Sequence, residues 1–185
     1  MWWNGRTFGF ILPFCHLIFF VTLIYYDGMK KPSFLSVIVG SGFGFGFSPV
    51  APGTMGALLA TLVWFGLSYL VSSACLLWLT VILILVFTFA GIWAADSLEA
   101  YWGEDPSRVV VDEMVGVWIA LLAVPAGHVW YALGAFVVFR LFDIFKPLGI
   151  KRMEKLSGGV GVMMDDILAG VYGFIVLIAA RWVIE

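Results

Sequence analysis

The sequence predicts an all-α protein: a polytopic membrane bundle of about five to six membrane helices with one glycine-rich re-entrant or interfacial segment. Of its 185 residues, 63% are apolar and the mean hydropathy is +1.06, whereas soluble domains are usually just under half apolar. Apolar runs recur at the length that crosses a bilayer, about 20 residues. Polar stretches are too short to form a soluble domain, and the net charge of −2 gives no sign of nucleic-acid binding.

The helices are predicted in order along the chain. Residues 8–26 form the first apolar run, which we expect to be a retained helix because no small-residue cleavage site follows it. Further membrane-length runs are predicted at residues 54–71, 76–95 and 167–183. Two shorter runs, 109–124 and 129–145, are separated by the sequence from Pro125 to His128, which predicts a tight helical hairpin.

Residues 36–47 differ from these runs because glycine occupies positions 40, 42, 44 and 46. A short apolar segment of this kind can enter the membrane without crossing it if other helices surround it. Small residues such as Gly42 and Gly46 also allow helices to pack closely. The two interpretations are compatible.

The distribution of basic residues predicts the orientation. Lys30 and Lys31 follow the first helix, and a second basic group lies in and after the 129–145 run, whereas loops 72–75 and 125–128 carry no Lys or Arg. Loops rich in Lys and Arg remain in the cytoplasm. The resulting path places the polar ends of the later helices at one cytoplasmic membrane face.

Six carboxylates border the apolar runs at that face: Asp105, Asp112, Glu113, Asp143, Asp165 and Asp166. Ionisable groups near a bilayer are unfavourable, so they are candidates for function. Acidic oxygens grouped without histidine are typical ligands of Mg²⁺. The two cysteines and two histidines have no neighbouring metal-ligand partners.

Asp112 and Glu113 are expected about one turn into a helix, pointing about 100° apart, so that only one faces the bundle centre squarely. A helix-start position favoured by the macrodipole is the simpler interpretation. Arg140, Asp143 and Lys146 share one helix face. They form either a salt-bridged face at the membrane interface or an acidic metal ligand between two phosphate-binding cations.

The segment from Gly158 to Asp166 predicts a glycine-rich loop that leads into two adjacent aspartates at a helix start, where backbone N–H groups approach an anion. The segment from Ser48 to Gly56 leads into the 54–71 helix. Thr54 is the expected N-cap, and a helix N-terminus can bind an anion, although an ordinary capped helix explains the pattern equally well.

Cation ligands and phosphate-binding groups at one membrane face predict metal-assisted hydrolysis of a phosphate on a lipid. The sequence lacks the Cys-x₅-Arg loop of cysteine phosphatases and an Asp-x-Asp nucleophile motif. Direct attack by water is therefore the first choice, and a phospho-aspartate intermediate stays open.

Four motifs resemble the phosphatidylglycerophosphatase A family: GFGFGFSPVAPGTMG at 42–56, VVDEMVG at 110–116 with Asp105, FRLFDIFKP at 139–147 and GGVGVMMDDILAG at 158–170. The resemblance covers residues 36–183 and divides the chain into an N-terminal hydrophobic helix outside the family core, 1–28, and a family-like membrane domain, 29–185. It implies a Mg²⁺-dependent enzyme of the bacterial inner membrane that hydrolyses phosphatidylglycerophosphate to phosphatidylglycerol and phosphate.

The resemblance also implies residue roles. The acidic site comprises all six carboxylates, with Asp112, Glu113, Asp143, Asp165 and Asp166 as metal ligands. Substrate and phosphate contacts come from Ser48, Thr54, Arg108, Arg140 and Lys146. Two other classes remain as alternatives: another Mg²⁺-dependent phospholipid-processing enzyme, and a cation or metabolite transporter, which would need acidic residues along a path through the membrane. The sequence makes no prediction of oligomeric state.

Overall fold

The computed structural model describes residues 32–103 and 106–184, apart from the side chain of residue 154. The predicted helix at 8–26, the domain boundary at residue 28, Lys30, Lys31 and Asp105 therefore lie outside the described residues. Within the described part every regular element is a helix, which confirms the predicted all-α class. The described residues from Ser33 onward belong to one compact unit.

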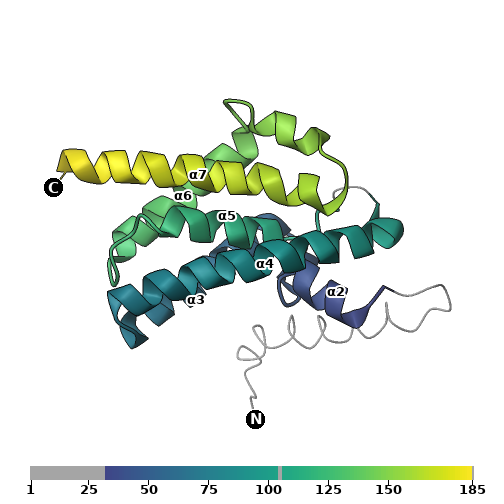
Figure 1. The fold of residues 1–185 in the computed structure, drawn as a ribbon, viewed down its shortest axis with the longest axis horizontal. Coiled ribbons are helices and arrows are strands. Elements are labelled where there is room, and N and C mark those ends of the chain that lie inside the picture. Colours follow the sequence, from purple (N-terminus) through teal and green to yellow (C-terminus); the bar gives the residue numbers. More distant parts are fainter. Residues whose placement is uncertain (1–31, 104–105, 185) are drawn as a thin grey trace, which may run out of the picture. The chain divides into compact units, whose positions relative to one another are not determined.

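The unit contains six α-helices and two short 3₁₀ helices among the described residues (Figure 1). The elements are α2 (Phe34–Gly40), η1 (Phe45–Phe47), α3 (Pro52–Leu70), α4 (Ser73–Trp102), α5 (Val111–Leu121), α6 (Val129–Phe145), η2 (Ile150–Lys155) and α7 (Gly158–Ile184). Figure 1 shows α4, α5 and α7 lying lengthwise alongside one another.

Three described helices, α3, α4 and α7, are long and apolar enough to cross a membrane. The outward face of α4 is apolar, with Trp78, Ile82, Leu85, Val86 and Phe89 each more than half exposed. Such a face is typical of a helix that contacts lipid. The 11-residue α5 and the 17-residue α6 are shorter than these three.

α5 is the central helix of the bundle. It packs against α3, α4, α6 and α7, and nine of its 11 residues are buried, including Asp112. Its apolar side chains therefore contact protein on all sides, which explains how a helix too short to span the bilayer is highly hydrophobic.

The closest approach of α5 and α7 occurs at Gly116 and Gly170. A methyl group on Gly170 would overlap the carbonyl oxygen of Gly116, and one on Gly116 would lie 2.7 Å from the carbonyl oxygen of Asp166 and overlap the ring of Phe139. The two backbones thus touch directly, as membrane helices do where small residues face each other. Gly116 follows Asp112 by about one turn, and Gly170 follows Asp166 by about one turn.

The glycine-rich segment before Asp165 is helical, so the predicted loop is wrong. α7 begins at Gly158 instead of residue 167, and α4 continues to Trp102 instead of ending at residue 95. A methyl group on Gly159 would overlap the carbonyl oxygen of Ile92, so glycine at this position lets α7 pack against the backbone of α4. The Gly159 N–H donates to the Asp96 carboxylate, which satisfies a free donor at the start of α7.

Residues 41–47 form turns and a 3₁₀ helix after α2. The Val110 N–H donates to the Gly40 carbonyl (2.8 Å), and a methyl group on Gly46 would overlap the Arg108 carbonyl oxygen. These contacts support the close-packing interpretation of the glycines. Entry of this segment into the membrane stays a prediction.

The predicted hairpin between α5 and α6 is confirmed, with turns over residues 122–127. The Gly127 N–H donates to Ser68 Oγ near the end of α3 (3.3 Å), and Arg181 near the end of α7 donates to the Ala123 carbonyl (3.0 Å). The hairpin and the C-terminal end of α7 therefore lie at the same end of the bundle, which we call the hairpin end.

Gly116→Ala should destabilise the protein by about 1–3 kcal/mol, because the added methyl group overpacks the contact between α5 and α7. Gly66→Ala is the matched control, since nothing lies within 4 Å of the methyl position on this exposed glycine of α3. Thermal unfolding in detergent measures both. Equal stability of the two variants would contradict the proposed helix contact.

Candidate active site

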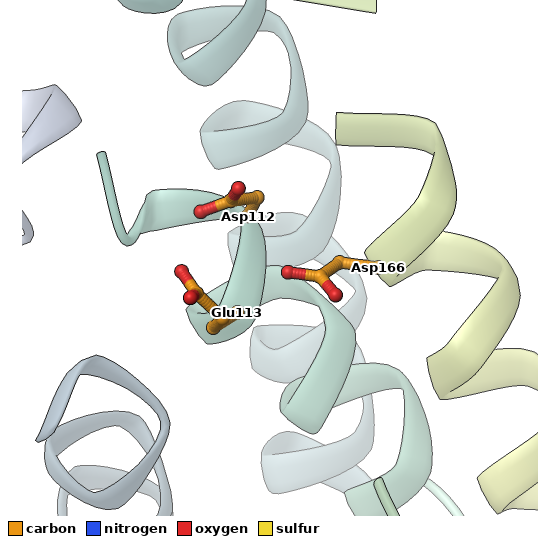
Figure 2. A group of neighbouring side chains, drawn as sticks. All are labelled: Asp112, Glu113 and Asp166. Atoms are coloured by element: carbon orange, nitrogen blue, oxygen red, sulfur yellow. The ribbon is translucent and has the colours of Figure 1, made fainter. Parts of the chain in front are cut away.

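Three carboxylates meet at the opposite end of the bundle from the hairpin. Asp112 and Glu113 lie in the first turn of α5, and Asp166 lies in α7. One carboxylate oxygen from each lies within 4.8 Å of the other two, and Figure 2 shows Asp166 reaching from α7 towards the start of α5. We call Asp112, Glu113 and Asp166 the carboxylate cluster.

Both α5 carboxylates belong to this cluster, and Asp112 is buried whereas Glu113 is only half-buried, which agrees with the expectation that only one of them faces the bundle centre squarely. The two side chains do leave the helix about 100° apart, but the longer Glu113 side chain reaches the group that Asp112 and Asp166 form. The structure therefore favours a cation site over the simpler macrodipole interpretation, because α7 brings a third carboxylate to the same point.

The cluster leaves buried oxygens without partners. Oδ1 of Asp112, Oε2 of Glu113 and Oδ1 of Asp166 are inaccessible to solvent and accept no hydrogen bond from the described residues. Asp112 is 7% exposed and Asp166 3% exposed. Buried charged oxygens are highly unfavourable unless a cation or a donor compensates them. One oxygen from each of these carboxylates lies within 4.8 Å of the other two, and carboxylate oxygens are hard donors, so the group fits a divalent cation such as Mg²⁺.

Two cations from the end of α6 flank the cluster. The Arg140 guanidinium forms an ion pair with Asp143, and its Nη1 lies 3.9 Å from Oε1 of Glu113. Lys146 Nζ lies 2.6 Å from Oδ2 of Asp165. Asp143 and Asp165 are thus the acidic partners of the two cations, and neither belongs to the carboxylate cluster.

Of the two interpretations of the Arg140, Asp143 and Lys146 face, the salt-bridged one is confirmed for Arg140 and Asp143, and metal and phosphate binding at this face stays a prediction. The face is salt-bridged, and it also lies beside the buried carboxylates. Five carboxylates face two cations here, a formal excess of three negative charges when all are ionised. A divalent cation would offset most of that excess. Arg140 Nε is buried without a hydrogen-bond partner among the described residues, so the guanidinium keeps a donor for an anion.

The start of α3 also reaches the cluster. A methyl group on Gly53 would overlap Oε1 of Glu113 and lie 3.4 Å from Nη1 of Arg140. Glycine at this position therefore lets the first turn of α3 touch the Glu113 carboxylate. Free N–H groups of a first turn, and the helix dipole, stabilise negative charge.

The prediction that Thr54 is the N-cap of α3 is wrong. Ala51 occupies the N-cap with a left-handed φ of 45°, and Pro52 takes the first helical position, which suits its fixed φ. Thr54 lies within the first turn and is half-buried. The Ser48 hydroxyl donates to the Val50 carbonyl (2.9 Å) and so stabilises the loop before the helix. Thr54 directly follows Gly53, the residue that meets Glu113, and the roles of Ser48 and Thr54 as phosphate contacts stay predictions.

The exposed guanidinium of Arg108 lies over aromatic rings, with its Cζ 6.0 Å from the ring centroids of Phe47 and Trp102. That contact is a cation–π interaction. Its role as a substrate contact stays a prediction, as does the role of Asp105.

Sequence reasoning missed Gly53 and Asp96. Gly53 appeared only as part of a loop motif, because its importance comes from Glu113, which is distant in sequence. Asp96 sits in an ordinary helical stretch and acts on Gly159. A local pattern marks neither contact, because both depend on which helices become neighbours.

Comparison with known proteins decides the family. The family model described as Phosphatidylglycerophosphatase A matches residues 38–181. The chain belongs to the phosphatidylglycerophosphatase A family. The matched range contains every described residue of the candidate site, from Ser48 to Asp166.

Three relatives match this chain over most of its length and over most of their own length. A Bacteroides thetaiotaomicron protein named putative phosphatidylinositol-3-phosphatase is 65% identical over 158 residues, 84% of this chain and 99% of the relative. Phosphatidylglycerophosphatase A of Haemophilus influenzae is 38% identical over 158 residues, 83% of this chain and 94% of the relative. Phosphatidylglycerophosphatase A of Escherichia coli is 33% identical over 149 residues, 78% of this chain and 84% of the relative. No solved structure matches the chain.

In this phosphatidylglycerophosphatase A family member, Gly53→Ala should weaken divalent-cation binding with little loss of stability. The added methyl group can be accommodated by displacing the Glu113 carboxylate, which is the end of a flexible side chain. We expect the apparent dissociation constant for Mg²⁺ to rise by about 10-fold or more.

The change in thermal stability with Mg²⁺ concentration measures this affinity, because a ligand of the folded state raises its stability. Gly66→Ala on the same helix is the control and should titrate like the unaltered protein. An unchanged Mg²⁺ titration of Gly53→Ala would contradict a role for Glu113 in holding the cation.

Proposed function

We propose that the protein hydrolyses the terminal phosphomonoester of phosphatidylglycerophosphate, giving phosphatidylglycerol and phosphate, in a Mg²⁺-dependent reaction. The observation that carries the proposal is the carboxylate cluster with its buried, unpartnered oxygens, beside Arg140 and Lys146, in a member of this family. Two relatives named for this activity support the choice of substrate.

Asp112, Glu113 and Asp166 would hold Mg²⁺. When bound, Mg²⁺ supplies neutralisation of phosphoryl charge and activation of water for attack on phosphorus. Asp143 and Asp165 pair with Arg140 and Lys146 at the edge of the cluster, and their own part in holding the cation stays a prediction. The carboxylates are buried on rigid helices, which keeps them arranged before the substrate arrives.

Arg140 and Lys146 would bind the phosphoryl oxygens. Arg140 brings an unpartnered Nε donor and a planar guanidinium, which matches the geometry of a phosphate. The first turn of α3, which contains Thr54, adds backbone N–H groups beside Glu113, and Ser48 lies in the loop before it. Together these groups would stabilise the charge that spreads over the phosphoryl oxygens during transfer.

We infer that the site faces the cytoplasm from a bacterial inner membrane. Exposed Lys151, Arg152 and Lys155 of η2 follow Lys146 at the site end of the bundle. The turns of the hairpin end, over residues 71–72 and 122–128, carry no Lys or Arg. An excess of basic residues on one side favours the cytoplasm for that side.

A second candidate substrate is a phosphatidylinositol phosphate. The observation that favours it is the 65% identity to a relative named putative phosphatidylinositol-3-phosphatase, over 99% of that relative. Both candidates carry a phosphomonoester on a polyol headgroup, so the same carboxylates and cations would act on either. Phosphate release from each lipid, measured side by side in detergent, separates the two candidates.

Asp166→Asn and Glu113→Gln should each lower kcat by roughly 100-fold or more on the preferred lipid, because each removes a charged ligand from the cluster. Ser73→Ala is the control, because Ser73 is an exposed residue at the hairpin end of the bundle, away from the cluster. Excess chelator should abolish activity of the unaltered enzyme. Full activity in chelator, or in Asp166→Asn, would refute the mechanism.

The orientation can be tested with cysteine labelling. Cys75 is exposed near the start of α4, at the hairpin end. In a Cys15→Ser background, a membrane-impermeant maleimide should label Cys75 in spheroplasts from the outside. A cysteine at position 151 in a Cys15→Ser, Cys75→Ser background should be labelled only after permeabilisation. The reverse pattern would contradict a cytoplasmic site.

A further inference from the structure

A cavity lies beside the site, between the end of α4 and the start of α7. Its volume is about 350 Å³, within the range of small-molecule sites. Its polar side chains are Glu99, Lys155, Ser157 and Asp165, and Pro106 and Val162 are among its apolar lining residues. Glu99, Lys155 and Ser157 have no part in the proposed roles of the carboxylate cluster and its flanking cations.

The cavity and the carboxylate cluster are lined by neighbouring residues of α7. Asp165 lines the cavity, whereas the next residue, Asp166, belongs to the cluster. Successive helical residues point about 100° apart, so α7 directs one aspartate to each space. A substrate whose phosphate lies at the cluster would therefore have its neighbouring atoms within reach of the cavity.

The chemistry of the lining favours hydroxyl groups over a second phosphate. Glu99 brings a carboxylate that accepts hydrogen bonds from neutral O–H donors, and its charge balances that of Lys155, while Asp165 is paired with Lys146, so the lining has no net positive charge for a second anion. The Ser157 hydroxyl can donate or accept, and Lys155 can donate to a hydroxyl oxygen. Such a mixture of donors and acceptors matches a polyhydric alcohol.

We propose that this cavity receives the polyol part of the lipid headgroup and that Glu99 and Ser157 help to select it. The proposal rests on the proposed function, because it places the phosphate of the same lipid at the carboxylate cluster. Glycerol and inositol share the required chemistry. Inositol is the larger, so filling the cavity should affect an inositol lipid more than a glycerol lipid.

Two variants test the cavity. Ser157→Phe places a large side chain at an exposed position on its rim, and Glu99→Gln removes one carboxylate without changing the volume. Ser73→Phe is the matched control, because Ser73 is an exposed serine at the hairpin end of the bundle. Steady-state kinetics with phosphatidylglycerophosphate and with phosphatidylinositol phosphate are measured for all three.

We expect both cavity variants to raise the KM of the preferred lipid by about 10-fold, as lost hydrogen bonds to charged groups do, with kcat little changed. Ser73→Phe should behave like the unaltered enzyme. If the inositol lipid is the substrate, Ser157→Phe should impair it more than it impairs the glycerol lipid. Unchanged KM values for both lipids in both folded variants would overturn the proposal.

Ligand-induced thermal stabilisation gives a readout that does not depend on turnover. In the presence of Mg²⁺, glycerol phosphate or inositol phosphate should stabilise the unaltered protein more than inorganic phosphate does, and Ser157→Phe or Glu99→Gln should remove that difference. Equal stabilisation by all three ligands in the unaltered protein would overturn the cavity proposal. Absence of lipid hydrolysis together with preferential polyol phosphate binding would instead refute the proposed function alone.

Discussion

The backbone contact between Gly116 of α5 and Gly170 of α7 is the constraint on which the site depends. Inside a membrane, helices gain little from the hydrophobic effect and associate through close van der Waals packing. This contact lies about one turn from Asp112 and Asp166, so it holds the two helices near enough for their carboxylates to meet. Packing thereby keeps together charges that would otherwise repel each other.

Close packing at a glycine also occurs at two edges of the site. Gly53 lets the first turn of α3 touch Glu113, and Gly159 lets α7 pack against the backbone of α4. The ion pairs Arg140–Asp143 and Lys146–Asp165 then surround the cluster from α6 and the segment after it. The result is a buried anionic site with cationic edges, an arrangement suited to a divalent cation and a phosphate together.

Much of this arrangement was predictable, because each carboxylate borders an apolar run and the runs have membrane length. That pattern predicts the helical class, the hairpin at Pro125 and the gathering of the carboxylates at one membrane face, but it does not predict which three of them meet. The glycines were harder to interpret. Gly158, Gly159 and Gly161 have low helix propensity and predict a loop, yet they form the first turn of α7, where Gly159 packs against the backbone of α4. The roles of Gly53 and Asp96 depend on distant partners, which periodicity and capping rules do not identify.

The central claim is that the carboxylate cluster holds the divalent cation that the reaction needs. Anomalous diffraction from crystals of the full chain grown with Mn²⁺ in place of Mg²⁺ tests this claim most directly. The account predicts a Mn²⁺ peak between Asp112, Glu113 and Asp166 that disappears in Asp166→Asn. A peak coordinated instead by Asp96 and Glu99, or none at a concentration that supports full activity, would contradict it.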